Sequence, residues 1–363
     1  MDDLKYWLAF NEITGLGPVR IARLLEAFKS PAEVFSSGRD ELICMGGLSR
    51  LLAEMIKKFN DWAKIEREIK FLDKHNFGVV TRAQREYPEM IKTIYDPPVI
   101  FYTAGNVEYL NTKCIAMVGS REPTPYGREV ARMLAKDLCG AGLTIVSGFA
   151  AGIDSEAHSA TLEAGGRTIA VFGCGIDIVY PKFNKTLYKQ VCSGGLAVSE
   201  FSPGVKPLRE NFPKRNRIIS GLSLGVVVIE AGIDSGSLIT AESAIEQGRE
   251  IFAIPGRVTS EKNSGCHKLI KSGAKLVENA DDILEELGTF RKNLPKKKVQ
   301  IELKMDPDEK NVVETLKGGK KQIDIIIRES NLPSSSVTSI LTKLEIEGVV
   351  TQHAGKIFEL RCT

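Results

Sequence analysis

Residues 114–127 read CIAMVGSREPTPYG: an apolar run ends in Gly119, Ser120 and Arg121, and a helical pattern follows. In Rossmann-like proteins, a glycine-rich loop at this place holds a phosphate against the N-terminus of the next helix. Arg121 stands where the dinucleotide fingerprint GxGxxG has its second glycine, and the chain has no GxxxxGK(S/T) sequence. The stretch therefore predicts a site for a single phosphate, without NAD, ATP or any other cofactor.

Seven short apolar segments indicate strands, and helix-length segments separate them. They span residues 114–118, 143–147, 168–172, 196–199, 225–229, 250–253 and 275–277. Strands that are apolar almost throughout belong to a parallel sheet with helices on both faces. Because βαβ crossovers are right-handed, we expect an α/β fold built on a doubly wound, Rossmann-like parallel sheet. Residues 78–112 are expected to add edge strands and a connection.

The two ends of the chain differ in character from the sheet. Residues 1–76 predict an all-α domain, and their turn at 13–20, ITGLGPVR, resembles a helix-hairpin-helix; an ordinary helix connection is the other interpretation. Residues 306–363 predict three helices and a hairpin, the pattern of a winged helix, which binds DNA or another protein. We therefore expect domains at 1–76, 77–287 and 306–363, with a basic linker at 288–305.

The composition excludes several classes of protein. With 49 Lys and Arg against 46 Asp and Glu, the net charge of +3 is too small to indicate a polyanion partner by itself. Seven cysteines without a CxxC pair indicate reduced thiols in the cytoplasm. The N-terminus lacks the pattern of a signal peptide, and no run approaches the roughly 20 apolar residues of a membrane helix. We therefore expect a cytoplasmic protein without membrane contact.

Neither a metal site nor a catalytic residue is predicted. The four histidines are scattered without metal-ligand spacing, and no Gly-x-Ser-x-Gly elbow is present. His158 follows the loop at 152–154. It is expected to brace that loop or, as the alternative, to act as a base.

Glycines and hydroxyl side chains follow several of the predicted strands. The carboxyl ends of parallel strands share one edge of a sheet, where ligands bind. The candidate phosphate-binding residues at this edge are Gly119, Ser120, Arg121, Ser147, Gly148, Gly236, Ser237 and Thr240. Backbone N–H groups and hydroxyls would donate to the anion, and the Arg121 guanidinium would bind it with two parallel hydrogen bonds. An ion pair of Arg121 with Glu122 or Asp154 is the alternative.

A basic segment with one aromatic residue lies between residues 205 and 217. It contains Lys206, Arg209, Lys214, Arg215 and Arg217, together with Glu210 and Phe212. Cations that follow a phosphate backbone and a ring that stacks on a base suit single-stranded nucleic acid. Anchoring in the core is the alternative role for Phe212.

Residues 114–286 resemble the DNA processing protein A (DprA/Smf) family. The similarity rests on short motifs in order: VGSR at 118–121, YG at 126–127, SG at 147–148, GID at 152–154, YP at 180–181, SE at 199–200, FP at 212–213, RNRII at 215–219, SGSLITA at 235–241 and PG at 255–256. It extends to both ends, because that family commonly carries a SAM-like or helix-hairpin-helix domain before the sheet and a winged helix after it. One departure is His267, where the family usually has asparagine.

The resemblance implies a cytoplasmic, dimeric protein without enzymatic activity. Members of the family bind and protect single-stranded DNA and help load the RecA recombinase, as in natural transformation of competent cells. The residues that would bind the phosphate are Gly119, Ser120 and Arg121, and those along the strand are Lys182, Asn184, Lys214, Arg215 and Arg217, with Gly236, Ser237 and Thr240 as further donors. Some of Arg215, Asn216 and Arg217 are expected to tie the loop to the sheet instead.

Two other functions stand as alternatives. A related sheet occurs in phosphoribohydrolases that act on nucleoside monophosphates and have the loop PGGxGTxxE. Residues 235–242 contain Thr240, but Glu242 is one residue short of that spacing. A duplex-reading transcription regulator would use the winged helix, whose predicted recognition helix at 334–347 carries Lys343 against Glu345 and Glu347. That charge balance weakens the regulator interpretation.

Overall fold

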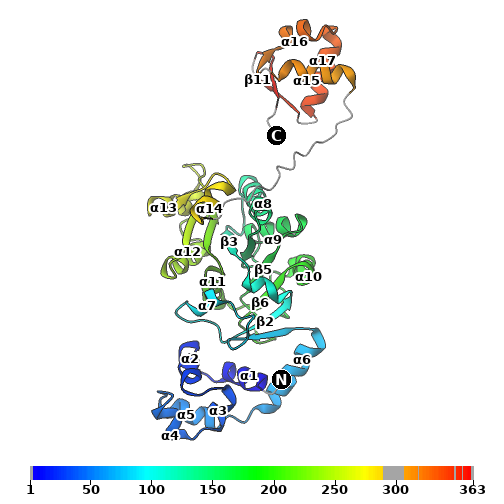
Figure 1. Ribbon diagram of the computed structural model, residues 1–363. Helices are drawn as coiled ribbons and strands as arrows, with labels where there is room; N and C mark the ends of the chain where they lie inside the picture. The colour runs from blue at the N-terminus through cyan, green and yellow to red at the C-terminus, as the bar shows by residue number, and fades with distance from the viewer. Residues whose placement is uncertain (1–2, 289–305, 318, 347–348, 354, 361–363) are drawn as a thin grey trace. The chain divides into compact units, whose positions relative to one another are not determined.

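The computed structural model describes residues 3–288, 306–317, 319–346, 349–353 and 355–360. The chain forms two compact units, Met1–Arg291 and Lys292–Thr363, which are described separately (Figure 1). The larger unit contains a sheet and an N-terminal group of helices. The predicted linker at 288–305 lies outside the described residues except for Gly288.

Nine strands within residues 3–288 form one sheet in the order β1-β2-β6-β5-β4-β3-β7-β8-β9. The strands are β1 (Gly78–Thr81), β2 (Ile100–Gly105), β3 (Cys114–Gly119), β4 (Thr144–Ser147), β5 (Thr168–Phe172), β6 (Leu196–Ser199), β7 (Gly225–Ile229), β8 (Glu250–Ala253) and β9 (Lys275–Leu276). Strands β3 to β9 run parallel to one another, whereas β2 pairs antiparallel with β1 and β6. The predicted doubly wound parallel sheet is confirmed, and residues 78–112 add two antiparallel strands at one side.

Helices precede the sheet and connect its strands. The N-terminal helices are α1 (Leu4–Glu12), α2 (Pro18–Ala27), α3 (Pro31–Ser36), α4 (Arg39–Cys44), α5 (Arg50–Lys57) and α6 (Trp62–His75). The connecting helices are α7 (Glu89–Lys92), η1 (Val107–Asn111), α8 (Pro125–Gly140), α9 (Ile153–Glu163), η2 (Lys182–Asn184), α10 (Lys185–Gly194), α11 (Asn211–Gly221), α12 (Gly236–Glu246), η3 (Glu261–Asn263), α13 (Ser264–Lys271) and α14 (Ala280–Glu286). Among the described residues, none of the helices has the length and hydropathy that crossing a membrane requires.

The central strand β3 is buried on both faces. Its residues Ile115 and Met117 belong to a core with α8, α9 and α14, while Ala116 and Val118 belong to a core with α11, α12 and α13. Side chains alternate because successive residues of a strand point to opposite faces of the sheet. This two-sided burial is why the strand is apolar throughout.

The N-terminal helices contact the sheet through a shared apolar core at the side of β2 and β6. A polar contact joins them too, because the Tyr102 hydroxyl of β2 donates to Glu68 Oε1 of α6 at 2.6 Å. The helix α6 ends at His75 and β1 begins at Gly78, so the change from helix to strand falls at the predicted position. The domain boundary itself stays a prediction, because both groups of elements belong to one compact unit.

The smaller unit is a winged helix, as predicted. Its elements are α15 (Pro307–Leu316), β10 (Lys321–Gln322), α16 (Ile323–Ser330), α17 (Ser334–Ile346), β11 (Val350–His353) and β12 (Ile357–Leu360). Val312, Leu341 and Phe358 pack in its core. The two predicted hairpin strands are β11 and β12, and the short strand β10 adds a third strand to their sheet by pairing with β12.

The strand order places a topological switch point between β3 and β7. The chain runs from β3 to β6 on one side and from β7 to β9 on the other. Gly119 pairs with Ile229 at the ends of β3 and β7, and a Cβ at residue 119 would lie 1.9 Å from the Ile229 carbonyl oxygen. Only glycine permits this approach, and ligands of open α/β sheets bind at such a switch point.

Gly119→Ala should therefore destabilise the larger unit by about 3 kcal/mol, because β3 and β7 must separate to admit the methyl group. Urea unfolding followed by circular dichroism measures this change. Gly140→Ala on α8 is the matched control, since nothing lies within 4 Å of its Cβ position. It should leave stability unchanged or raise it by up to about 1 kcal/mol; equal stability of the two variants would contradict the tight junction.

Candidate nucleic-acid interface

The loop after β3 has a fixed backbone at the switch point. The Ser120 N–H donates to the Glu230 carbonyl at 2.8 Å, and the Ile153 N–H donates to the Ser120 carbonyl at 3.1 Å. Gly152 has a φ of +80°, and a Cβ there would lie 2.3 Å from the Ser120 carbonyl oxygen. The loops after β3, β4 and β7 thus meet at the carboxyl edge, as the sequence predicts.

Three side chains, Arg121, Tyr180 and Phe212, form a surface group that we call the Arg121 cluster. The Arg121 guanidinium carbon lies 5.6 Å from the centre of the Phe212 ring. The Tyr180 and Phe212 ring centres are 5.7 Å apart and the planes are tilted by 42°. Arg121 and Tyr180 are exposed, and Phe212 is half-buried. The cluster combines an accessible cation with two aromatic rings, which suits a nucleotide's phosphate and base.

The two alternatives for Arg121 and Phe212 can be compared with these contacts. Within the part of the chain that the structure describes, no salt bridge of Arg121 with Glu122 or Asp154 is found. The Phe212 ring is partly accessible, although its edge rests on Gly173, where a Cβ would lie 3.0 Å from the ring. Arg121 is therefore exposed beside the Phe212 ring, and Phe212 both packs on Gly173 and keeps part of its ring accessible.

The exposed lysines Lys182 and Lys214 lie on the segments that carry the cluster, in η2 after Tyr180 and in α11 after Phe212. Asn184, in contrast, is 7% exposed, and its amide donates to the Ser155 hydroxyl at 2.9 Å. Lys182 and Lys214 can reach a ligand, whereas Asn184 ties the loop after β5 to α9.

Arg215 lies beneath the surface, which corrects its predicted contact with DNA. Its side chain is 4% exposed and donates to the carbonyls of Gly148, at 2.5 Å, and Val171. Asp154 accepts from the Gly148 N–H at 3.1 Å, and its charge acts on Arg215. Burial lowers the pKa of Arg215 to about 10, so it stays protonated at neutral pH. Arg215 supports the loops from below.

Arg217 is also part of the framework rather than of the accessible surface. Its guanidinium donates twice to Glu200, at 2.8 and 2.6 Å, and its Nε lies 2.8 Å from Asp96 Oδ2. A bidentate pair of this kind occupies the donors that a phosphate would need. The expectation that some of the residues at 215–217 tie the loop to the sheet thus applies to Arg215 and Arg217, whereas Lys214 is exposed.

Three of the predicted hydroxyl donors, Ser147, Ser237 and Thr240, are buried beneath the carboxyl edge of the sheet. Ser147 is fully buried and donates to the Met117 carbonyl at 2.6 Å, and Thr240 is 2% exposed. Ser237 is 7% exposed, and its hydroxyl lies 2.8 Å from that of Ser235. Gly148 is buried under the Arg215 guanidinium, whereas Gly236 is exposed at the start of α12. These residues shape the edge, and Gly236 is its accessible member.

Glu230 was not among the predicted site residues, although it closes the N-terminus of α8. It is 2% exposed and has a φ of +55°. Its carboxylate accepts from the Thr124 N–H at 3.0 Å and from the Thr124 hydroxyl at 2.6 Å. The sequence feature that could have identified Glu230 is an acidic residue directly after a buried strand.

Tyr180 was also not predicted as a site residue, and in the sequence it appeared only as part of the YP motif at 180–181.

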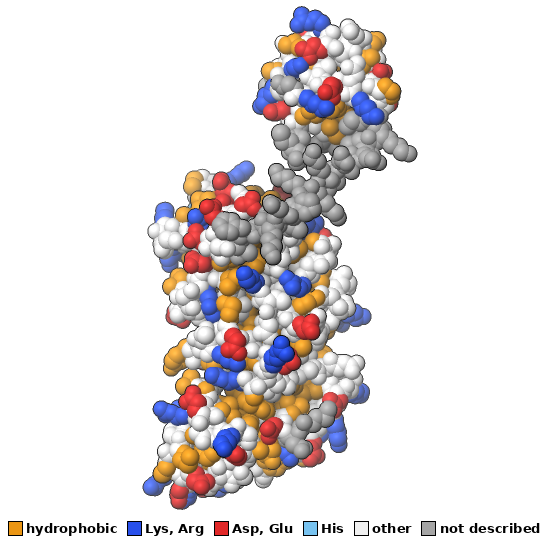
Figure 2. Space-filling model, viewed as in Figure 1, with side chains coloured by type: hydrophobic (Ala, Val, Ile, Leu, Met, Phe, Trp, Pro, Cys, Tyr) orange, Lys and Arg blue, Asp and Glu red, His pale blue; other side chains and the backbone are white. Residues whose placement is uncertain are grey.

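The charged side chains of the larger unit are mixed in sign. Figure 2 shows Lys and Arg interspersed with Asp and Glu on the visible face, in keeping with the small net charge. In the described ranges, no group of three or more His, Cys, Asp or Glu residues could hold a metal ion. On this visible face the basic side chains do not form one continuous patch.

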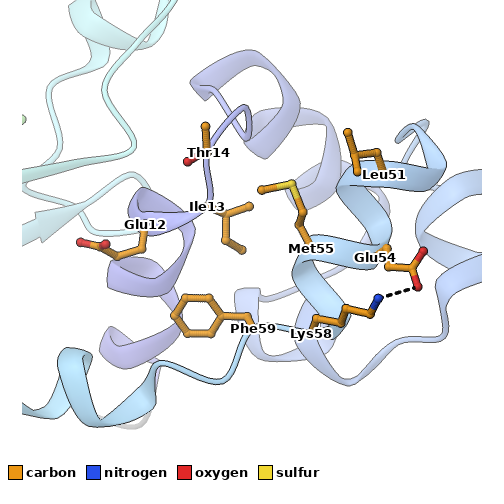
Figure 3. A pocket seen from close by; sticks show the side chains of 8 residues that line it. All are labelled: Glu12, Ile13, Thr14, Leu51, Glu54, Met55, Lys58 and Phe59. Atoms are coloured by element: carbon orange, nitrogen blue, oxygen red, sulfur yellow. Dashed lines mark ion pairs between the residues drawn. The ribbon is translucent and has the colours of Figure 1, made fainter.

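A pocket of about 410 Å³ lies among the N-terminal helices, away from the Arg121 cluster. Figure 3 shows Ile13 and Met55 facing it, with Phe59 at one side and the Glu54–Lys58 ion pair at its rim. It adjoins the glycine turn at 13–20, whose helix-hairpin-helix interpretation stays a prediction.

The chain matches the family described as DNA recombination-mediator protein A over residues 78–288, and the DprA winged helix domain over residues 296–356. Protein Smf of Escherichia coli is 37% identical to it over 99% of this chain and 97% of its own length. The chain belongs to the DNA recombination-mediator protein A family. Protein Smf of Synechocystis sp., at 32% identity over 98% of both chains, agrees with this assignment.

Two solved structures of the family resemble this one. DNA processing protein A from Streptococcus pneumoniae aligns with a TM-score of 0.68 at 37% identity, over 78% of this chain and 97% of its own. DNA processing protein A from Helicobacter pylori, whose structure addresses its single-stranded DNA binding mode, aligns with a TM-score of 0.54 at 29% identity, over 58% of this chain and 95% of its own.

His267 stands at the position where asparagine was expected. Its Nε2 lies 3.1 Å from the Gly256 carbonyl oxygen, so the histidine still makes a polar contact within this loop.

His158 is a buried residue of α9 that contacts β5. It is fully buried, and its Nδ1 lies 2.7 Å from the Thr168 hydroxyl. Burial, with the nearby charge of Arg215, lowers the pKa of His158 to about 3. A side chain without solvent access is not placed to act as a base on a ligand. The hydrogen bond of His158 joins α9 to β5, and bracing of the loop at 152–154 stays a prediction.

The buried His158 predicts a specific loss of stability in acid. Between pH 6.5 and about 3 the unfolded chain binds a proton at His158 that the folded protein excludes, so stability falls as pH decreases. His158→Asn, which can still bond to Thr168, should make this fall shallower by about 1.4 kcal/mol per pH unit. Urea unfolding from pH 7 to 4.5 measures the slopes. A wild-type slope in His158→Asn would refute the buried neutral histidine.

Proposed function

We propose that this protein is a recombination mediator that binds single-stranded DNA across the carboxyl edge of its sheet. The observation that carries the proposal is the Arg121 cluster. A backbone phosphate would bind to Arg121, and an unpaired base would stack on Phe212 or Tyr180. Membership of a family of recombination mediators supports this role, as does the single-stranded DNA binding of the Helicobacter pylori relative.

The geometry favours a single strand over a duplex. A guanidinium binds a phosphate through two parallel hydrogen bonds, and stacking of a base on an aromatic ring contributes about 1–3 kcal/mol. In a duplex the base faces are covered by their neighbours, so only the phosphate contact would remain. Affinity for single strands should therefore depend on both parts of the cluster.

The strand would continue over exposed cations beside the cluster. On the predicted path Lys182 and Lys214 are accessible basic side chains, and Gly236 is exposed at the start of α12. Gly119 and Ser120 would act by holding the loop that carries Arg121. Arg215, Arg217, Ser147 and Thr240 would act indirectly, by holding these loops in place.

The proposal includes finer roles that the family relationship suggests. We infer that the protein acts as a homodimer in the cytoplasm, protects incoming DNA during natural transformation of competent cells, and helps load the RecA recombinase. The name DNA processing protein of relatives in Bacillus subtilis and Streptococcus pneumoniae is consistent with this role.

Binding without catalysis is part of the proposal. The alternative, a phosphoribohydrolase, would bring Thr240 and a glutamate into one site. Glu242 is exposed on α12 while Thr240 is 2% exposed, and residues two apart on a helix do not share a face. Release of a base from nucleoside monophosphates above the blank would overturn this assignment.

Arg121→Glu should raise the dissociation constant for an oligothymidylate at least tenfold, because a repulsive carboxylate replaces the phosphate contact. The slope of log K against log salt should also fall by about 0.7, as expected for one phosphate of a single strand. Fluorescence anisotropy at several salt concentrations measures both. The matched control is Lys113→Glu, the same charge change immediately before β3, which should alter affinity less than threefold.

Phe212→Leu separates stacking from charge, because it removes the ring and leaves the cations. Affinity should fall with an unchanged salt slope. Affinities of both Arg121→Glu and Phe212→Leu equal to wild type would refute the Arg121 cluster as the binding site, and equal wild-type affinity for duplex and single strand would refute the preference for single strands.

The RecA role predicts that the protein shortens the lag of RecA filament formation on single-stranded DNA covered by single-strand-binding protein. Arg121→Glu should lose this effect, since loading requires binding of the strand, while Lys113→Glu should keep it. RecA-dependent ATP hydrolysis reports the lag. An unchanged lag with the wild-type protein would contradict the loading role and would leave strand binding to be judged by its own assay.

A further inference from the structure

The N-terminus of helix α8 is closed by a carboxylate from another strand. Glu230, directly after β7, accepts from the Thr124 N–H with Oε1 at 3.0 Å and Oε2 at 3.1 Å, and from the Thr124 hydroxyl at 2.6 Å. The Thr124 hydroxyl in turn accepts from the Gly127 N–H at 3.2 Å, as the cap of α8. A chain of hydrogen bonds therefore connects the first turn of α8 to Glu230.

The carboxylate leaves no space for another anion at this position. Glu230 is 2% exposed, and a Cβ on Gly127 would lie 2.2 Å from its Oε2. In open α/β sheets the phosphate of a nucleotide binds here, at the helix that follows the first parallel strand, where N–H groups and the helix dipole favour negative charge. In this chain the protein's own carboxylate supplies that charge.

Glu230 also holds the other end of the same loop. Its main-chain carbonyl accepts from the Ser120 N–H at 2.8 Å, while its side-chain carboxylate accepts from the Thr124 N–H. Glu230 therefore fixes both residue 120 and residue 124. Its φ of +55° is a conformation that a residue with a Cβ rarely adopts without a local reason. The segment held between these two points carries Arg121.

We propose that Glu230 is the positioning residue of the interface: an internal anion that takes the phosphate position of α8 and thereby directs Arg121 toward Phe212. It would exclude nucleotide phosphates from α8 and leave Arg121 as the phosphate contact. The proposal rests on single-stranded DNA binding for its effect on affinity, but the occupied anion position can be tested without DNA.

Glu230→Gly tests the proposal, because glycine accepts the positive φ while the carboxylate is removed. The variant should bind an oligothymidylate at least tenfold more weakly than wild type. Acetate in place of chloride at equal ionic strength should restore most of the affinity and raise the variant's thermal midpoint, since a small carboxylate can fill the vacated position. The wild-type midpoint should not respond. Glu230→Gln, which keeps the shape and an acceptor for the Thr124 N–H, should bind within about threefold of wild type.

A double variant shows whether Glu230 acts through Arg121. Arg121→Glu with Glu230→Gly should lose no more affinity than Arg121→Glu alone, whereas independent effects would add. If Glu230→Gly does not fold, a comparison of Thr124→Val with Thr124→Ser replaces it. Thr124→Val should bind the oligothymidylate more weakly than wild type, and Thr124→Ser should bind it with wild-type affinity.

Three results would overturn the positioning role. The first is wild-type affinity in Glu230→Gly. The second is a loss of affinity in Glu230→Gly that acetate does not reverse, together with a thermal midpoint that acetate does not raise. The third is equal affinity of Thr124→Val and Thr124→Ser. Failure of the proposed function is distinguishable, because then the wild-type protein would not bind the oligothymidylate at all, while the response of the midpoint to acetate would still report on Glu230.

Discussion

The close approach of β3 and β7 is the constraint on which the interface depends. The Ile229 carbonyl occupies the space that a Cβ of residue 119 would need, and the Ser120 N–H then reaches the Glu230 carbonyl. Because this junction lies at the switch point of the sheet, the loop after β3 leaves the sheet in one direction. The exposed position of Arg121 follows from the two strand ends, and not from the length or flexibility of its own side chain.

A second layer of charges supports this edge from below. The Arg215 guanidinium is buried, yet the carbonyl groups of Gly148, just after β4, and of Val171, within β5, accept its hydrogen bonds, and the Asp154 carboxylate balances its charge. Burial of an ion without such partners is costly. Burial raises the pKa of Asp154 while Arg215 lowers it, so each group limits the cost of the other. The buried charges of Arg215 and Asp154 thus hold the loops of the interface in place. The exposed cations Arg121, Lys182 and Lys214 are accessible to a ligand.

The sheet could be predicted from sequence because two-sided burial makes each strand an uninterrupted apolar run, and the position of Arg121 followed from the end of such a run. The roles within the basic run at 214–217 could not. Successive residues on α11 point about 100° apart, so Lys214 is exposed while Arg215 is buried, and the count of charges does not reveal which. Glu230 was missed because its partner Thr124 lies 106 residues away in the chain.

The central claim is that the strand's phosphate binds at Arg121 while Glu230 keeps the N-terminus of α8. A crystal structure of the full chain with a short oligothymidylate tests it most directly. The account predicts a phosphate within hydrogen-bonding distance of the Arg121 guanidinium, a base against Phe212 or Tyr180, and the Glu230 carboxylate still bonded to Thr124. A phosphate at the N-terminus of α8 with Glu230 displaced, or a strand bound away from the carboxyl edge of the sheet, would contradict it.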